Sequence, residues 1–248
     1  MAVCARQRDQ AAMKRACLLP LGRLANRLGC GVLLMLASAC ASHPVPPDWE
    51  QNAQAEIKRF TTDYLAGNTS KADSDFIRAR RAVRDTGRVD LLAQIELVRC
   101  AVRVAVLEFD GCAGYNPLRD GATPAQQSYA AYLSGQWQAV DPNLLPEQHR
   151  AVVSAKPSVT ATTNVSAQPS VLIGVPDPLS RLVAAGALLQ AGRLQPADVE
   201  LAIDAASAQG WRRPLLGWLG IANRLAEQRG DKASVERIAR RVALIVGD

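Results

Sequence analysis

Four segments near the C-terminal end of the chain have the same start and stop signals, with proline or aspartate at the start and glycine at the end. The starts are Asp177-Pro178, Gln195-Pro196, Arg213-Pro214 and Asp231, and the stops are Gly192, Gly210, Gly230 and Gly247. Proline suits the first helical position, where its missing N–H has no partner, and glycine accepts the left-handed backbone that ends a helix. The pattern therefore predicts four short helices.

These four helices pair into hairpins over residues 178–210 and 214–247. Each hairpin has roughly the 34 residues of a tetratricopeptide-like repeat, and in length and helix–turn–helix plan it resembles one. The resemblance covers only the last third of the chain, and most signature residues of that family are absent. It implies a short α-solenoid-like stack in the C-terminal region, 177–248.

Apolar residues also recur at helical spacing through the N-terminal region, 48–153. The first predicted helix runs from Asp48, with a capping-box-like Gln51, to Gly67, and the second ends at Gly87. The third runs from Val89 toward Phe109. A fourth runs from Thr123-Pro124 to Gly135, and a shorter one starts at Pro146 and carries His149. The third is apolar on most sides, which is typical of a buried central helix. Its second half, 101–109, alternates enough that a strand is the alternative.

Residues 154–176 interrupt the helical pattern. They consist of Ser, Thr, Val, Ala and Pro and carry one charge before the last helices begin, on Lys156. This composition predicts an irregular linker or long loop, and a short hairpin is the alternative. The chain is thus expected to be all-α, built from antiparallel helical hairpins.

The N-terminal 39 residues are typical of an export signal. Basic residues precede an apolar run that begins at Leu28 and ends in Leu36-Ala37-Ser38-Ala39-Cys40. The run has about 12 residues, too few for the ~20 of a membrane-spanning helix. The small residues before Cys40 resemble the lipobox of bacterial lipoproteins, which implies cleavage after residue 39 and acyl chains on Cys40.

That resemblance also implies a location. Ala41 follows the cysteine, and in the lipoprotein family a residue other than aspartate there directs sorting to the outer membrane. Residues 40–47 contain three prolines and predict a stiff tether of roughly 20 Å at ~3.1 Å per residue. The protein is therefore expected to be anchored to the outer membrane by its lipid, facing the periplasm.

Cys100 and Cys112 are the two cysteines left after the signal and the lipid site. An oxidising periplasm favours a disulfide between them, and two buried free thiols are the alternative. The bridge requires the third helix to end by about Phe109 and the chain to double straight back.

The charge of the chain excludes one class of partner. The net charge of +6 falls to +1 once the basic signal is removed. No clustered basic face remains of the kind that nucleic-acid binding requires, so no nucleic-acid partner is expected.

Catalytic patterns are nearly absent. The chain has two histidines, His43 and His149, and no zinc, nucleophile-elbow, P-loop or C-x-x-C motif. Glu96 is a candidate general acid, but Arg99 is expected to pair with it, as Arg103 is with Glu108. Asp73 and Asp75, the arginines at 80, 81, 84 and 88, and His149 are interpreted as ordinary helix-face residues. We predict no catalytic residue, no metal and no cofactor besides the lipid.

The segment Trp211-Arg212-Arg213 is the candidate partner-binding patch, because Trp and Arg are enriched at binding hot spots. Plain core packing between the hairpins is the favoured interpretation of the neighbouring Trp218 and of Leu215, Leu219, Ala222 and Leu225. These features together predict an interaction or scaffolding module that binds envelope proteins. The alternatives are a cell-envelope enzyme using Glu96 and a protein that binds a lipid or peptidoglycan fragment between its helices.

Overall fold

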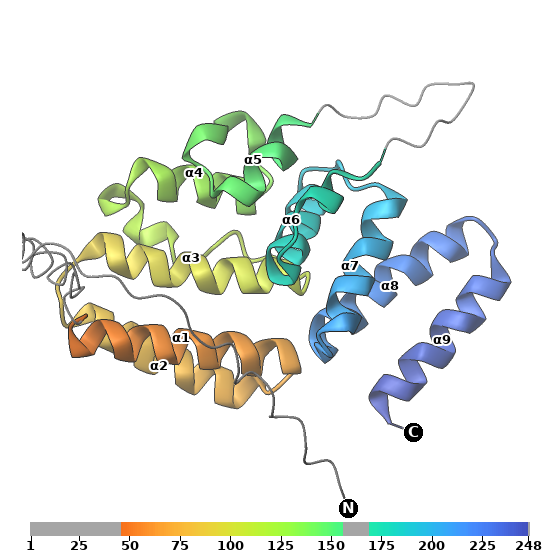
Figure 1. The fold of residues 1–248 in the computed structure, drawn as a ribbon, viewed down its shortest axis with the longest axis horizontal. Coiled ribbons are helices and arrows are strands. Elements are labelled where there is room, and N and C mark those ends of the chain that lie inside the picture. Colours follow the sequence, from red (N-terminus) through yellow and green to blue (C-terminus); the bar gives the residue numbers. More distant parts are fainter. Residues whose placement is uncertain (1–45, 156–168, 248) are drawn as a thin grey trace, which may run out of the picture. The chain divides into compact units, whose positions relative to one another are not determined.

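The computed structural model describes residues 46–155 and 169–247. Every regular element in these two ranges is a helix, which confirms the predicted all-α fold (Figure 1). The predicted signal, Cys40 and most of the tether lie outside the described residues, as does the middle of the predicted linker.

The described residues form nine α-helices, joined by turns and four short 3-10 segments. The α-helices are α1 (Asp48–Ala66), α2 (Thr69–Arg84), α3 (Val89–Ala105), α4 (Pro124–Leu133), α5 (Glu147–Ser154), α6 (Pro178–Gln190), α7 (Pro196–Ala208), α8 (Arg212–Gln228) and α9 (Lys232–Val246). The 3-10 segments are Asn116–Gly121, Trp137–Ala139, Pro142–Leu144 and Val171–Gly174. All four predicted C-terminal helices are present and end at their glycines, but α8 begins at Arg212, before the predicted start, with Pro214 inside its first turn.

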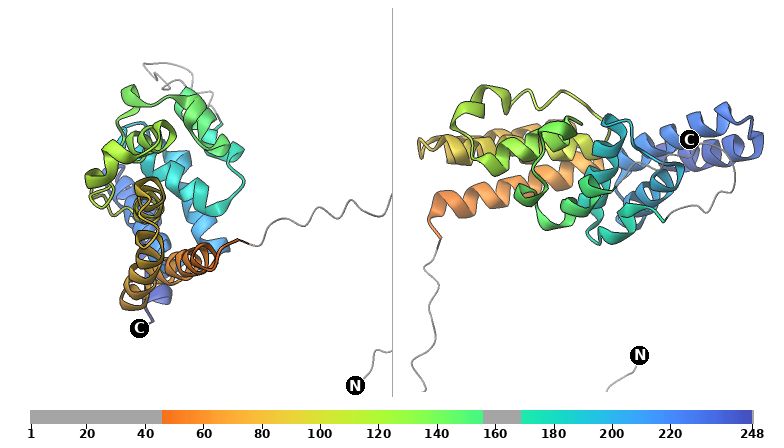
Figure 2. Two further views of the ribbon diagram at one scale, coloured as in Figure 1. Left: turned by 90° about the vertical axis from the view of Figure 1, so that its left-hand side faces the viewer. Right: turned by 90° about the horizontal axis from the view of Figure 1, so that it is seen from above.

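Helix α3 is the centre of the N-terminal region, as its apolar sequence predicted. The α1–α2 hairpin packs along one side of it, and α4 lies on another side (Figures 1 and 2). A small aromatic cluster, formed by Phe60, Tyr64 and Phe76, fills the space between the hairpin and α3. A second, larger core joins α3 to α4 and to α6, α7 and α8.

The C-terminal end of α3 is where the N- and C-terminal regions meet. A Cβ atom on Gly186 of α6 would overlap the carbonyl oxygen of Val104, so glycine allows α6 to cross α3 closely. The indole of the fully buried Trp218 on α8 donates a hydrogen bond of 3.1 Å to the carbonyl oxygen of Ala105. The core is therefore continuous across the predicted linker.

The predicted linker is partly built into this core. Ser170 and Leu172 are buried, and the Ser170 hydroxyl donates to the carboxylate of Asp198 on α7. The described end of this segment thus contains a short 3-10 turn, Val171–Gly174, that is packed against α7. The prediction of an irregular linker or long loop stays a prediction.

Two helix ends also differ from the prediction. The α1 helix begins after Pro47 without a side-chain cap, because the N-cap residue is a proline and offers no side-chain acceptor, and the Gln51 amide donates to the carbonyl oxygen of Pro46. Helix α3 ends at Ala105, before Phe109, and the backbone then turns through a left-handed Leu107 with φ of 66°.

Helices α6 to α9 follow one another as packed neighbours toward the C-terminal end (Figure 1). The last of them, α9, has no buried residue and packs mainly against α8. Antiparallel hairpins are present here, and their α-solenoid-like stacking stays a prediction.

Candidate functional site

A groove of about 500 Å³ lies between α3, α4, α5 and α6. We call it the α3–α6 groove. Its lining residues are Gln94, Leu97, Val98, Ala101, Val102, Thr123, Ala125, Gln126, Tyr129, Leu144, Leu145, Pro146, Gln148, His149, Leu179, Ser180 and Val183. Its volume lies in the range that protein sites use for small ligands and short chain segments.

The lining of the α3–α6 groove is apolar and uncharged. Leucine, valine, alanine and proline side chains make up most of it, and Asp, Glu, Lys and Arg are absent from it. The polar groups are amides and hydroxyls, chiefly Gln94, Gln126 and Gln148 on the more exposed side. Such a surface attracts apolar groups and can hydrogen-bond to neutral polar ones, and it offers nothing to a charge.

The start of α4 positions one of these amides. Thr123 caps the helix in a capping box with Gln126, the arrangement that the sequence pattern S/T-x-x-Q favours. The Gln126 side-chain nitrogen also donates to the carbonyl oxygen of Asp90, at 2.8 Å, and to the side-chain oxygen of Gln94, at 3.3 Å. This bonding ties α4 to the beginning of α3 and fixes the mouth of the groove.

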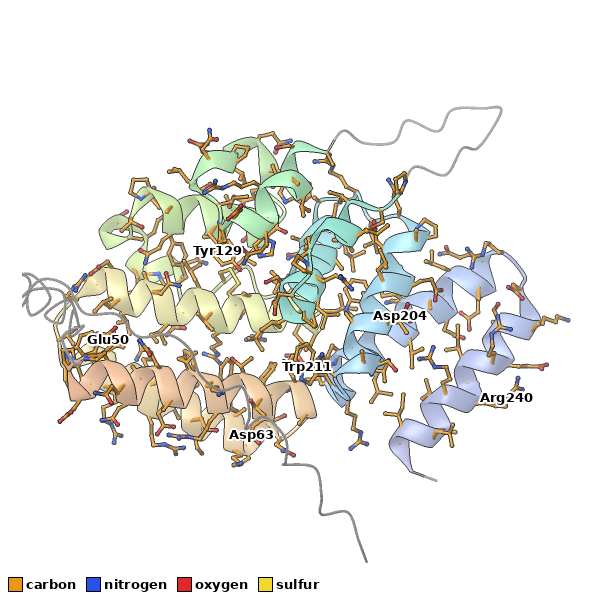
Figure 3. All side chains as sticks on the ribbon, viewed as in Figure 1. Glu50, Asp63, Tyr129, Asp204, Trp211 and Arg240 are labelled. Atoms are coloured by element: carbon orange, nitrogen blue, oxygen red, sulfur yellow. A yellow bond between two sulfur atoms is a disulfide. The ribbon has the colours of Figure 1, made fainter. Side chains whose placement is uncertain are left out.

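Aromatic side chains and a histidine close the other wall of the groove. Tyr129 lies between α4 and α3 (Figure 3), and burial raises the pKa of its hydroxyl well above the usual range. The Nδ1 atom of His149 lies 3.2 Å from the hydroxyl of Tyr132. Burial lowers the pKa of His149 to about 4, although Asp177 acts in the opposite direction. The imidazole is therefore neutral at neutral pH, in keeping with the uncharged lining.

A disulfide joins Cys100 in α3 to Cys112, as the sequence predicted. Their Cα atoms are 5.1 Å apart, and the chain doubles back through left-handed Gly111 and Cys112 to allow this. The bridge closes the turn that follows α3. It holds the end of the helix that forms the floor of the groove.

Glu96 lies away from the groove. Its side chain is 4% exposed and accepts a hydrogen bond of 2.8 Å from Nε of Arg80 on α2. The predicted partner, Arg99, instead lies over the ring of Phe76, 4.8 Å from the centroid. The Glu96–Arg99 pairing was thus wrong, because the neighbouring helix α2 supplies a closer guanidinium than the next turn of α3.

Glu108 joins a network that connects α1, α3 and α8. The Tyr64 hydroxyl donates to its carboxylate, and Nε of Arg213 lies 3.0 Å from it. The predicted partner Arg103 is 3.8 Å away from Glu108 and pairs more closely with Asp110, at 2.7 Å. Burial and the Glu108 carboxylate raise the pKa of Tyr64 to about 12, so its hydroxyl stays protonated and donates.

The structure separates the residues of the predicted Trp211-Arg212-Arg213 patch. Trp211 is half-buried and packs against both hydrophobic clusters (Figure 3). Arg213 stacks 4.0 Å from the ring of Tyr64 while it pairs with Glu108. Of the three residues, Arg212 alone is exposed.

The two aspartates in α2 also differ from one another. Asp73 is exposed, whereas Asp75 is buried and pairs with Arg78 and, at 3.9 Å, with Arg59 on α1. Across residues 46–155 and 169–247 no cluster of His, Cys, Asp and Glu is arranged to hold a metal ion. In the same residues no helix combines the length and hydropathy needed to cross a membrane.

Comparison with known proteins leaves the site to be interpreted from its own geometry. No protein-family model, curated protein or solved structure matches this chain. The sequence did not predict this groove, because its lining comes from four helices and each helix contributes residues that look like ordinary core residues. The run Leu144-Leu145-Pro146 between short helices was the one available signal.

Proposed function

We propose that this protein is a lipid-anchored, non-catalytic interaction module of the bacterial cell envelope. In this proposal Cys40 carries the lipid at the outer membrane, and the folded residues face the periplasm. The α3–α6 groove holds an uncharged, largely apolar segment of a partner protein. The groove's uncharged lining is the observation that carries the proposal.

The chemistry of the groove favours a chain segment as its occupant. Val98 and Leu179 offer surface to apolar side chains, while the glutamines at the mouth can bond to backbone N–H and C=O groups. Apolar surface beside a few orienting polar groups is the usual lining of a protein binding site. Leu144 lines the same groove and is 39% exposed, which leaves apolar surface free for contact.

The two alternatives have less support. An enzyme based on Glu96 would need that carboxylate to face a ligand, but Glu96 is buried, pairs with Arg80 and does not line the α3–α6 groove. A lipid would also suit the apolar lining of the α3–α6 groove. The glutamines at its mouth favour a peptide over an acyl chain, and the experiment below distinguishes the two.

Site-specific photo-cross-linking in envelopes tests the groove. Ala125 is exposed at the groove, and Ala55 is equally exposed on α1, away from it. A photo-reactive phenylalanine analogue at position 125 should give a discrete protein adduct that the same analogue at position 55 does not give. Leu144→Asp should suppress that adduct, because a carboxylate in the uncharged groove is costly.

Three outcomes would overturn the proposal. The same adduct from positions 125 and 55 would show that the groove is not selective. An adduct that contains lipid alone would favour the lipid-binding alternative. An adduct that persists undiminished in Leu144→Asp would place the contact outside the groove.

The anchor is tested separately. Mass spectrometry of the mature protein should find an acylated N-terminus at Cys40, and Cys40→Ser should leave the protein unprocessed or unanchored. A mature N-terminus elsewhere, without acyl chains, would remove the anchor from the proposal and leave the groove test unaffected.

A further inference from the structure

A second groove, of about 350 Å³, lies between α7, α8 and α9. We call it the α7–α9 groove. Its apolar lining includes Val199 and Ile203 of α7, Leu219 and Leu225 of α8, and Ile238 of α9. The groove differs from the first in its charged groups, which are Arg229, Arg237, Arg241 and a single carboxylate, Glu200. The lining thus has an excess of two positive charges.

The three arginines of this groove have no carboxylate partner among residues 46–155 and 169–247. Arg237 donates to the Ser234 hydroxyl, at 2.7 Å, and neither Arg229 nor Arg241 forms an ion pair in these ranges. Arg241 is half-buried, so its charge is partly removed from water without a protein anion in return. The nearby Asp231 does not line the groove, and its carboxylate caps α9 by accepting from the backbone and hydroxyl of Ser234.

The C-terminal hairpin carries a net positive charge. Residues 212–248 carry eight basic and four acidic residues, whereas residues 41–211 carry fifteen and eighteen. The rest of the exported chain is therefore slightly acidic, and a small anion near the protein is attracted to the C-terminal hairpin. Within that hairpin, the α7–α9 groove collects three of the eight basic residues.

The geometry points to a binding site for a phosphate-bearing ligand in the α7–α9 groove. Guanidinium groups present paired N–H donors that match phosphate oxygens, and several of them around one cleft are typical of phosphate recognition. A phosphomonoester carries close to two negative charges at neutral pH and so balances the lining. Leu225 and Ile238 can contact the organic part of the ligand.

This site is independent of the proposed function, since it shares no lining residue with the α3–α6 groove. The phosphate can belong to a lipid headgroup or to a free small molecule, because both present the same oxygens to the arginines. A concave site between three helices favours a single ligand over the flat contact that α9 alone would make with a bilayer.

Calorimetry on the full-length protein in neutral detergent tests the site with two soluble probes. Hexyl phosphate and hexyl sulfate have the same tail and differ in charge. Hexyl phosphate should bind about tenfold more tightly, because the lining is matched to a dianion. Flotation with phosphatidic acid vesicles, compared with phosphatidylcholine vesicles, then shows whether a lipid headgroup reaches the groove.

A matched pair of double variants separates the groove from general charge. Arg237→Gln with Arg241→Gln removes two arginines of α9 that line it. Arg224→Gln with Arg240→Gln removes one arginine from α8 and one from α9 that do not line it (Figure 3 labels Arg240). The first pair should weaken hexyl phosphate binding at least about tenfold, and the second should change it less than about twofold. Thermal melts should show that both variants remain folded.

Binding of hexyl phosphate that depends on Arg237 and Arg241 supports the site, with or without binding to phosphatidic acid vesicles. Equal losses in the two double variants would reduce the effect to diffuse electrostatics and overturn the proposal. Equal affinity for the phosphate and the sulfate would also overturn it. Tighter binding of an acidic peptide than of hexyl phosphate would assign the surface to a protein partner instead.

Discussion

Helices α3 and α9 are similar in length, at 17 and 15 residues, and opposite in environment. Nine residues of α3 are buried, and none of α9 is. The α1–α2 hairpin, α4 and α6 all pack on α3, whereas α9 packs mainly against α8. The stability of the fold is therefore concentrated around α3, and the last helix contributes little to it.

The same contrast distinguishes the two grooves. The α3–α6 groove has α3 as its floor, and a disulfide and a capping box hold the surrounding elements. The α7–α9 groove has α9, the least buried helix, as one wall. A ligand in the first groove meets a fixed surface, and a ligand in the second groove should stabilise the wall it binds.

The largest effect is expected where α8 meets α3. Trp218→Ala should lower the free energy of unfolding by ~3–5 kcal/mol, because it leaves a cavity in the core and removes the donor to the carbonyl of Ala105. Trp211→Ala should cost clearly less, since Trp211 is only half-buried. Denaturant melts of both variants measure this. Equal losses would mean that Trp211 is as much a core residue as Trp218 and would end its candidacy as a binding anchor.

The disulfide after α3 should have the next largest effect. Cys100→Ser together with Cys112→Ser should reduce the free energy of unfolding by on the order of 3 kcal/mol, because the bridge restricts the unfolded chain. Chemical unfolding of the double variant measures the loss, and the wild-type protein melted with reductant is the control. A double variant as stable as the oxidised protein would show that packing alone holds the turn.

Acid should weaken the wall of the α3–α6 groove through His149. Its pKa is lowered to about 4 in the folded protein, so between pH 6.5 and 4 the unfolded state binds the extra proton. The stabilising contribution is complete above pH 6.5, and about 2 kcal/mol of it should be lost between pH 7 and pH 5. His149→Gln should flatten this part of the pH–stability curve. An unchanged slope in that variant would assign the dependence to other groups.

The sequence predicted most of the fold because single residues determine where the helices begin and end. Proline, aspartate and glycine at positions such as Pro178 and Gly192 act locally, and their effect needs no knowledge of neighbours. The Cys100–Cys112 bridge was predicted for a similar reason, since two cysteines remained and one pairing was possible.

The long-range contacts were not accessible in the same way. Spacing alone indicates Arg99 as the partner of Glu96, and only the packing of α2 on α3 brings Arg80 to it. Likewise, nothing in the sequence places Val98 and Val183 in one groove. Gly186 permits the close crossing of α6 over α3, but a glycine within a helix does not by itself predict such a crossing.

The smallest effect is expected at the far end of α9. Leu244 is 84% exposed, so Leu244→Ser should change the free energy of unfolding by less than about 0.5 kcal/mol. The matched control is Leu219→Ser on α8, where the leucine is fully buried and the same exchange should cost several kcal/mol, roughly 3 or more. Thermal and denaturant melts of the two variants make the comparison. A loss above about 1 kcal/mol for Leu244→Ser would show that this leucine is covered in solution. Sedimentation of the wild-type protein would then decide whether a second copy covers it, and the contrast between α3 and α9 would hold only for the single chain.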